Sequence, residues 1–253
     1  MKIAVVTGAS SGMGREFVRR LDAADYYDEI WVIARRRERL EALAAETNAV
    51  LRILPLDLTK EESIEEYKAL LEKEKPSVAV LVNGSGFGKF CAFTDATLEE
   101  YYSMIDLNVK ALVAMTYVTL PYIPVGGQFY QIASLSAFQP VPYINVYGAT
   151  KAFVLSFSRA LNAELKGRAV RVMAVCPGYV RTEFFDHAVT DDTISHYNKF
   201  YEPDQVVKTA MKDMKKGKDV SICRFSVKAQ VLAVKFLPHK TVMRGWLKQQ
   251  KKD

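Results

Sequence analysis

Short apolar runs alternate with amphipathic helical stretches along most of this chain, and this alternation limits the folds available to it. The apolar runs are rich in Val, Ile, Leu and Ala and show little period-two alternation, which is typical of strands buried on both faces of a parallel sheet. Seven runs have strand character, at residues 2–8, 29–34, 50–58, 77–84, 127–134, 169–178 and 219–223. Helical periodicity occurs between them at residues 13–24, 36–47, 60–74, 98–123 and 146–165. This order predicts an α/β protein with helices on both faces of a parallel sheet.

The repeated β-α-β order predicts a Rossmann-type, doubly wound sheet of about seven strands in one domain, residues 1–224. Residues 225–253 are expected to be a basic C-terminal helical extension of that domain. Ligands of such sheets bind at the carboxyl ends of the strands, so the site is expected there. The first residues, MKIAVVTGAS, enter a strand pattern directly, and the three cysteines show no close spacing. We therefore expect a cytoplasmic protein without a signal peptide, a disulfide framework or a metal site.

The net charge of +6 is unevenly distributed. Residues 215–253 carry eleven Lys or Arg and two acidic residues, so the rest of the chain is slightly acidic. A nucleic-acid-binding protein would more often be basic over its folded body as well, so we expect no nucleic-acid partner. Residues 225–237 and 240–253 have apolar residues at helical spacing, with Pro238 as a break. Three interpretations stay open: packing on the body or a second subunit, an interfacial membrane helix peripheral to a membrane surface, or contact with a protein or acidic ligand.

A glycine-rich turn, TGASSGMG, follows the first strand at residues 7–14. Its glycines would let the backbone turn sharply and approach a pyrophosphate, and the next helix would offer free N–H groups. The spacing is G-x-x-x-G-x-G, and its place in a β-α-β unit predicts dinucleotide binding. The expected cofactor contacts from this turn are Gly8, Ser10, Ser11, Gly12, Met13 and Gly14.

The end of the second strand reads VIARRRER, residues 32–39. An NAD site has an acidic residue here, whereas this chain has an alanine followed by arginines. An arginine can pair with a 2′-phosphate, so the sequence predicts NADP, with Arg35 as the main contact. Arg37 and Arg39 fit a solvated basic helix turn. Asp57, after the third strand, is placed to meet the edge of the adenine ring.

Tyr147 and Lys151 lie four residues apart on one face of a predicted helix. A free tyrosine has a pKa of about 10, and a nearby ammonium would lower that pKa toward the range useful for proton transfer. Ser134 precedes Tyr147 by thirteen residues, at the end of the fifth strand, where its hydroxyl could hold a substrate oxygen. These three side chains together suit a site that reduces a carbonyl group.

The chain resembles a short-chain dehydrogenase/reductase of the short, single-domain branch. The matching segments are TGASSGMG, the Asp57–Leu58 pair, LVNGSG, DLNV, IASLS, YGATK and CPGYVRTEF, in this order over residues 1–185. The resemblance implies a Rossmann fold and NAD(P)-linked oxidoreduction. It implies that Tyr147 is the general acid/base, that Lys151 binds the nicotinamide ribose and that Ser134 orients the carbonyl. It also implies that Asn108 lies at a disturbed helical turn and holds a water in a proton relay.

Further cofactor contacts follow from the same resemblance. Those implied are Leu58, Asn83, Gly84, Gly86, Pro177, Gly178, Val180 and Thr182. One of these positions departs from the family pattern, which usually reads Asn-Asn-Ala-Gly after the fourth strand; this chain reads Asn-Gly-Ser-Gly. Gly84 cannot supply the side-chain hydrogen bonds of the second asparagine. The local rigidity and cofactor affinity that this asparagine gives to the family therefore cannot be assumed for this chain.

Aromatic residues bear on the substrate. Segment 181–202 is expected to lie over the nicotinamide as a lid and contains Phe184, Phe185, Tyr197, Phe200 and Tyr201. Other loops at the same sheet edge contain Phe87, Phe90, Phe93 and Phe138. An apolar pocket with few polar anchors would suit a lipophilic ketone or aldehyde, steroid-like or acyl-chain-like. The alternative is that about half of these aromatics only pack the lid onto the body.

The leading hypothesis is an NADP-dependent carbonyl reductase or alcohol dehydrogenase that forms a homo-oligomer. The alternative hypothesis is a non-catalytic NADP-binding sensor or scaffold that acts through its basic tail. The serine, tyrosine and lysine set argues against the alternative, because a pure sensor has no need of the phenol.

Overall fold

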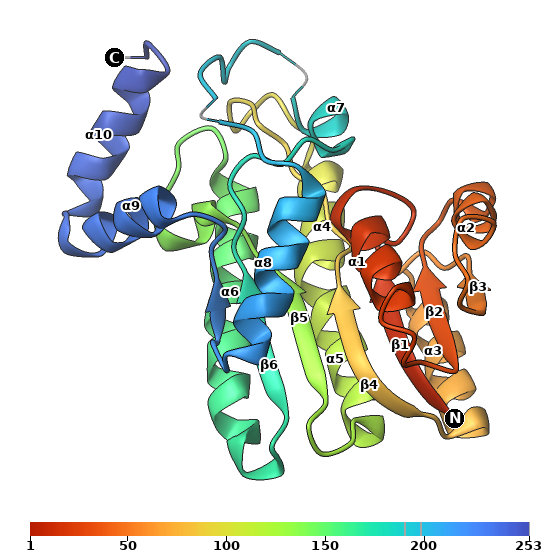
Figure 1. The fold of residues 1–253 in the computed structure, drawn as a ribbon. Helices are drawn as coiled ribbons and strands as arrows, with labels where there is room; N and C mark the ends of the chain where they lie inside the picture. The colour runs from red at the N-terminus through yellow and green to blue at the C-terminus, as the bar shows by residue number, and fades with distance from the viewer. Residues whose placement is uncertain (190, 198, 253) are drawn as a thin grey trace.

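The computed structural model describes residues 1–189, 191–197 and 199–252, and it confirms the predicted doubly wound α/β fold (Figure 1). Seven parallel strands lie in the order β3-β2-β1-β4-β5-β6-β7. They are β1 (Lys2–Thr7), β2 (Glu29–Ile33), β3 (Leu51–Leu54), β4 (Ser77–Asn83), β5 (Gln128–Ile132), β6 (Arg171–Val175) and β7 (Val220–Ser221). The direction of winding reverses between β1 and β4, which is where ligands bind in sheets of this kind.

Helices cover both faces of the sheet because the strands are apolar on both sides. Successive residues of β1 point to opposite faces, so Ala4 and Val6 enter one core while Ile3 and Val5 enter the other. The first core packs against α1 (Gly12–Asp22), α2 (Arg37–Ala44) and α8 (Pro203–Lys215). The second packs mainly against α3 (Glu61–Glu74), α5 (Leu112–Thr119) and α6 (Asn145–Glu164). Each fully buried large side chain contributes about 1.5–3 kcal/mol to this arrangement.

The predicted helical region 98–123 forms as one continuous run with an irregular turn inside it. The run consists of α4 (Leu98–Ile105), the π-helical turn η1 (Asp106–Ala111), α5 and the 3₁₀ turn η2 (Leu120–Tyr122). Thr97 and Glu100 fix its start through a capping box, in which each side chain bonds the backbone N–H of the other residue, at 3.2 and 2.9 Å. The wider π-helical turn carries Asn108.

Two elements differ from the sequence prediction. Strand β3 ends at Leu54 instead of residue 58, because Pro55 has no N–H to continue the ladder. Helix α8 was not predicted, although Val206, Val207, Ala210 and Met214 repeat at helical spacing and are buried. The predicted lid contains the short helix α7 (Phe184–Ala188), and residues 190 and 198 of that lid lie outside the described residues.

The basic tail forms two helices, α9 (Phe225–Phe236) and α10 (His239–Gln249), which turn sharply at Pro238 (Figure 1, blue). The indole N–H of Trp246 donates to the Pro142 carbonyl at 3.1 Å. The buried Gln250 side chain accepts from the backbone N–H of Ser195 and of His196, at 3.1 and 2.9 Å. The tail therefore packs on the body of its own chain. None of the described helices is both long and apolar enough to cross a membrane.

Candidate active site

A cavity of about 1170 Å³ lies at the carboxyl ends of the strands. Its wall includes the glycine turn after β1, the arginines after β2, the ends of β4 and β5, one face of α6 and the two C-terminal helices. All the site residues predicted from the sequence line this cavity except Asn83 and Asn108. The structure therefore brings the expected cofactor and catalytic groups into one continuous space.

The glycine turn has the bare backbone surface that a pyrophosphate requires. Gly8 and Gly12 have φ angles of +69° and +52°, which favour glycine. A Cβ on Gly8 would lie 2.7 Å from the Gly84 carbonyl, and one on Gly12 would lie 2.9 Å from the Thr182 methyl. A Cβ on Gly14 would collide with the Gly8 carbonyl oxygen. Because α1 begins at Gly12, its free N–H groups face the same space, and the turn fits a dinucleotide.

Two arginines, Arg35 and Arg36, line the cavity beyond this turn. Arg36 donates to the Ser10 hydroxyl at 3.2 Å and pairs with Glu183 at 3.0 Å. Arg37 pairs along α2 with Glu41 at 3.7 Å, as a solvated helix turn would. Sequence reasoning missed the Arg36–Glu183 pair, because the arginine run marks Arg36 only as one of several candidates and nothing marks Glu183.

Asp57 has a local structural role as well as a place in the cavity wall. Its carboxylate accepts from the backbone N–H of Thr59 at 3.1 Å and from the Thr59 hydroxyl at 2.8 Å. These bonds fix the turn that leads into α3. Asp57 can therefore present a carboxylate with a defined orientation to the adenosine end of the cavity.

Asn83, predicted to line the adenosine side, is not among the residues that line the cavity. Its side chain is buried and donates to the Thr116 hydroxyl at 3.0 Å and to the Gln131 amide oxygen at 2.8 Å. This polar network lies inside the core, where each member needs a partner. Asn83 thus ties the end of β4 to β5 and α5 and holds the neighbouring loop from behind.

Gly84, the departure from the family pattern, has a steric reason in this chain. A Cβ there would lie 2.7 Å from the Thr7 carbonyl oxygen. The backbone N–H groups of Gly84 and Ser85 both donate to the Thr7 hydroxyl, at 3.0 and 3.1 Å. The loop is therefore held by Thr7 without an asparagine side chain.

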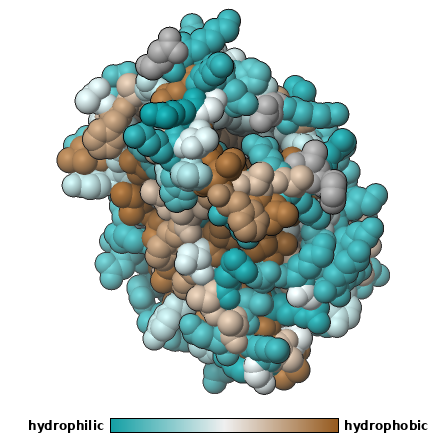
Figure 2. Space-filling model, turned by 90° about the vertical axis from the view of Figure 1, so that its left-hand side faces the viewer, coloured by the Kyte–Doolittle hydropathy of each residue, from teal (hydrophilic) through white to brown (hydrophobic). Residues whose placement is uncertain are grey.

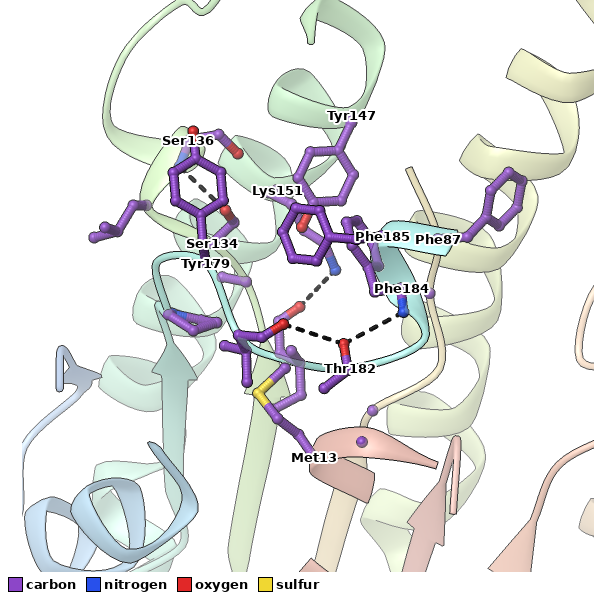
Figure 3. A pocket seen from close by; sticks show the side chains of 18 of the residues that line it. Met13, Phe87, Ser134, Ser136, Tyr147, Lys151, Tyr179, Thr182, Phe184 and Phe185 are labelled. Carbon is purple, nitrogen blue, oxygen red and sulfur yellow. Dashed lines mark hydrogen bonds between the residues drawn. The ribbon is translucent and has the colours of Figure 1, made fainter. Parts of the chain in front are cut away.

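Tyr147 and Lys151 extend from the same face of α6 toward Ser134, with Phe184 and Phe185 beside them (Figure 3). Lys151 is 4% exposed, and its ammonium donates to the Ile132 carbonyl at 2.7 Å. The same nitrogen lies 5.6 Å from the centre of the Tyr147 ring. Ser134 caps the turn after β5 by accepting from the Ser136 N–H at 3.2 Å.

Burial shifts the pKa values of Tyr147 and Lys151 in opposite directions. It raises the pKa of Tyr147 to about 12, and the neighbouring Ser134 hydroxyl opposes this shift. It lowers the pKa of Lys151 to about 8. The sequence predicted that Lys151 would lower the pKa of Tyr147, but here desolvation of the phenol dominates. Tyr147 is therefore a protonated hydroxyl at neutral pH and a weaker acid than a free tyrosine.

Asn108 lies in η1 next to α6 and is not among the residues that line the cavity. Its side-chain oxygen accepts from the Phe87 N–H at 3.1 Å, and its amide donates to the Phe87 carbonyl at 2.9 Å and the Thr150 hydroxyl at 3.1 Å. Thr150 in turn donates to the Tyr147 carbonyl at 2.7 Å. Asn108 therefore joins the loop after β4 to the turn of α6 that carries Tyr147.

Aromatic side chains surround the Tyr147 ring, which has Phe90 and Phe184 at centroid distances of 5.7 and 5.4 Å. Of the aromatics predicted to form the pocket, those that line the cavity are Phe87, Phe90, Phe138, Phe184, Phe185 and Tyr201. Tyr197 and Phe200 pack against each other and against Tyr179 and Phe185. Phe93 is 61% exposed and stacks on Tyr101, so its predicted place in the pocket is wrong.

The far end of the cavity is built by the C-terminal helices, which sequence reasoning did not connect with the site. Their contributions are Val227, Gln230, Val231, Val234, Val242, Gly245, Trp246 and Gln249. Figure 2 views the molecule from this side, where apolar side chains gather in the middle of the face. The Ser136 hydroxyl at the cavity wall has no hydrogen-bond partner within the described part of the chain. In residues 1–189, 191–197 and 199–252, no group of three or more His, Cys, Asp or Glu is placed to hold a metal ion.

A doubly wound sheet with a phosphate-binding turn and a buried tyrosine–lysine pair in one cavity defines a dinucleotide-binding oxidoreductase. The short chain dehydrogenase family model matches residues 2–193, and the chain belongs to this family. The family and fold predicted from the sequence are thereby confirmed.

Several known proteins are similar to this chain. The NADP-dependent 3-hydroxy acid dehydrogenase YdfG of Escherichia coli K12 is 40% identical over 187 residues, covering 72% of this chain and 74% of that protein. Serine 3-dehydrogenase of Agrobacterium fabrum is 36% identical over 185 residues, covering 71% of this chain and 72% of that enzyme. A short-chain dehydrogenase from Sphingobium yanoikuyae in complex with NADPH superposes with a TM-score of 0.82 at 29% identity, over 98% of this chain and 96% of that one.

Proposed function

We propose that this protein is an NADP-dependent oxidoreductase that interconverts a ketone or aldehyde and an alcohol, with Tyr147 as general acid/base. The observation that carries the proposal is the single cavity that joins the glycine turn and Arg35 to Tyr147 and Ser134. The relative named as NADP-dependent and the similar structure that contains NADPH support the choice of cofactor.

The side chains divide the reaction between them. Bound NADPH supplies the hydride that reduces the carbonyl carbon. The Tyr147 hydroxyl donates its proton to the carbonyl oxygen, while the Ser134 hydroxyl holds that oxygen in place. Lys151 binds the nicotinamide ribose and returns a proton toward Tyr147. Asn108 positions the loop and helix on either side of these groups.

A lipophilic substrate fits the far end of the cavity best. Its wall there combines the rings of Phe87, Phe184 and Trp246 with the valines of α9. Polar side chains, among them Lys89, His187 and Lys199, also line the cavity. Ser136, Gln230 and Gln249 remain as hydrogen-bonding anchors. A steroid-like or acyl-chain-like ketone would bury its apolar body against this wall with its carbonyl at Tyr147.

We further propose two associations. Exposed aromatics on two helices, Tyr117 on α5 and Phe153 on α6, support a homo-oligomer, which light scattering would detect as a multiple of the chain mass. The outer side of α9 exposes Leu232 and Phe236 beside Lys235, which supports peripheral contact with an anionic membrane surface.

The catalytic assignment is tested with Tyr147→Phe. This variant keeps the ring packing but loses the proton donor, so NADPH oxidation with ketones should fall about 10²–10⁴-fold. NADPH affinity, measured by fluorescence titration, should stay within about twofold of the wild type. The substrate panel runs from small diketones to steroids and 3-oxoacyl thioesters. Full activity of the variant would refute the mechanism, and NADPH binding without turnover of any carbonyl by the wild type would favour the sensor hypothesis.

The cofactor assignment is tested with Arg35→Ala, with Arg37→Ala as the matched control. Loss of a charge-assisted hydrogen bond to a phosphate costs about 1.5–3 kcal/mol, so the dissociation constant for NADPH should rise about 10- to 100-fold. NADH binding should change little, because NADH lacks the 2′-phosphate. The control should bind both cofactors like the wild type, since Arg37 pairs with Glu41 on the helix surface. Equal losses for NADPH and NADH in Arg35→Ala would contradict the assignment.

A further inference from the structure

A carboxylate from the lid segment reaches across the adenosine end of the cavity. Glu183 directly follows Thr182, the residue that lies against Gly12 of the glycine turn. One Glu183 oxygen lies 3.0 Å from the Arg36 guanidinium, and the other contacts the guanidinium of Arg39. These pairs hold the pKa of Glu183 below its usual range, so its charge is present at neutral pH.

The two arginines differ in where they lie. Arg36 lines the cavity together with Glu183 and also donates to Ser10 on the glycine turn. Arg39 belongs to α2, and its side chain is 44% exposed. The Arg36 guanidinium, which lines the cavity beside Arg35, is thus already paired with an acid of the same chain. A second anion that enters here must share or displace Glu183, and two like charges at one guanidinium repel each other.

We propose that Glu183 competes with the 2′-phosphate of NADP(H) for Arg36. When Arg36 binds the phosphate, Glu183 stays paired with Arg39. This inference rests on the proposed use of NADP. Glu183 is then a specificity-determining residue, which lowers affinity for phosphorylated cofactors and leaves NADH unaffected.

The test compares ligands that have the 2′-phosphate with ligands that lack it. Adenosine 2′,5′-bisphosphate and 5′-AMP differ only in the 2′-phosphate, and both bind without the nicotinamide. Glu183→Gln should bind the bisphosphate and NADPH about two- to fivefold more tightly, the range expected when an exposed ion pair is removed, and the gain should shrink at high salt. Its affinity for 5′-AMP and NADH should not change. Asp186→Asn, which removes an exposed charge three residues further along, should have no such selective effect.

Some results would overturn the proposal. An equal change for all four ligands would mean that Glu183 acts on the fold of the turn and not on the phosphate. Weaker binding of the bisphosphate would mean that Glu183 orders Arg36 for the phosphate instead of competing. If the wild type binds the bisphosphate and 5′-AMP equally, the proposed NADP function itself fails, and this outcome is distinct from a failure of the Glu183 competition.

The role of Arg39 has a separate test. In Arg39→Gln, Arg36 is the one basic partner left to Glu183 within residues 1–189, 191–197 and 199–252. Affinity for the bisphosphate should therefore fall about two- to fivefold while that for 5′-AMP stays constant. Adding Glu183→Gln to this variant should restore the affinity. If the double variant binds the bisphosphate as weakly as Arg39→Gln does, Arg39 contacts the phosphate directly. The proposal that Arg39 pairs with Glu183 when the phosphate binds would then be wrong.

Discussion

Burial of Lys151 has a consequence for stability as well as for chemistry. The pKa of Lys151 falls from 10.5 to about 8 on folding, so between these pH values the unfolded chain holds a proton that the folded protein lacks. A group of this kind costs most stability below pH of about 8, where it is charged in both states. The cost disappears as the pH rises toward the unfolded pKa.

Lys151→Met should therefore gain stability relative to the wild type at neutral pH and lose that advantage in alkali. The difference in the free energy of unfolding should shrink by about 2–3 kcal/mol between pH 7 and pH 10.5, which follows from the size of the pKa shift. Urea unfolding of both proteins at these pH values measures the difference. A difference that is the same at both pH values would show that the pKa of Lys151 is not lowered.

At the scale of elements, two helical glycines differ in whether the surrounding structure requires a residue without a Cβ. Gly14 lies in the first turn of α1 against the Gly8 carbonyl, where no Cβ fits. Gly245 lies inside α10, where a Cβ would meet no atom of the described chain within 4 Å. The first glycine is required by the close approach of two backbone segments, whereas no neighbouring atom of the described chain requires the second, which weakens its helix.

Substitution of each glycine by alanine should separate these cases. Gly245→Ala should raise the free energy of unfolding by about 0.5–1 kcal/mol, because alanine restricts the unfolded chain and favours the helix. Gly14→Ala should lower it by about 1–3 kcal/mol, as overpacking does, and should weaken NADPH binding. Urea unfolding and fluorescence titration measure both effects. A stable Gly14→Ala variant with normal NADPH affinity would contradict the tight packing of the turn.

Features that depend on residues close together in the sequence could be predicted, whereas contacts between residues far apart in the sequence could not. The seven strands could be predicted because each carries its own apolar signal, and Tyr147, Lys151 and Ser134 because family spacing marks them. The Arg39–Glu183 contact joins residues 144 positions apart, and no local pattern marks it. The position of the tail could not be predicted either. Its apolar spacing predicts a buried face, but no pattern in residues 225–253 indicates that this face lines the cavity.

At the scale of the whole molecule, charge and apolar exposure coincide at α9. Leu232 is 57% and Phe236 81% exposed, and the surrounding tail is strongly basic. The inner side of the same helix, through Val231 and Val234, forms the wall of the cavity. A lipophilic substrate dissolved in a membrane would therefore meet the protein at the helix that borders its binding site.

The membrane proposal predicts that the full chain sediments with vesicles of anionic lipid and is released by salt, since each basic residue near such a surface contributes about 1 kcal/mol. Leu232→Gln combined with Phe236→Gln should reduce the bound fraction severalfold. Val125→Gln, which changes an apolar residue that is 83% exposed in the loop before β5, should not. Identical binding of the wild type and the double variant, or no binding by either, would contradict the proposal.

The family match ends at residue 193, whereas α9 and α10 close the far end of the cavity. The groups proposed for hydride transfer thus lie within the residues that the family model matches, and much of the wall that would contact the substrate lies beyond them. These two parts can diverge at different rates. If the proposed sites are right, changes in α9 and α10 would alter the choice of substrate while leaving Tyr147, Lys151 and Ser134 in place.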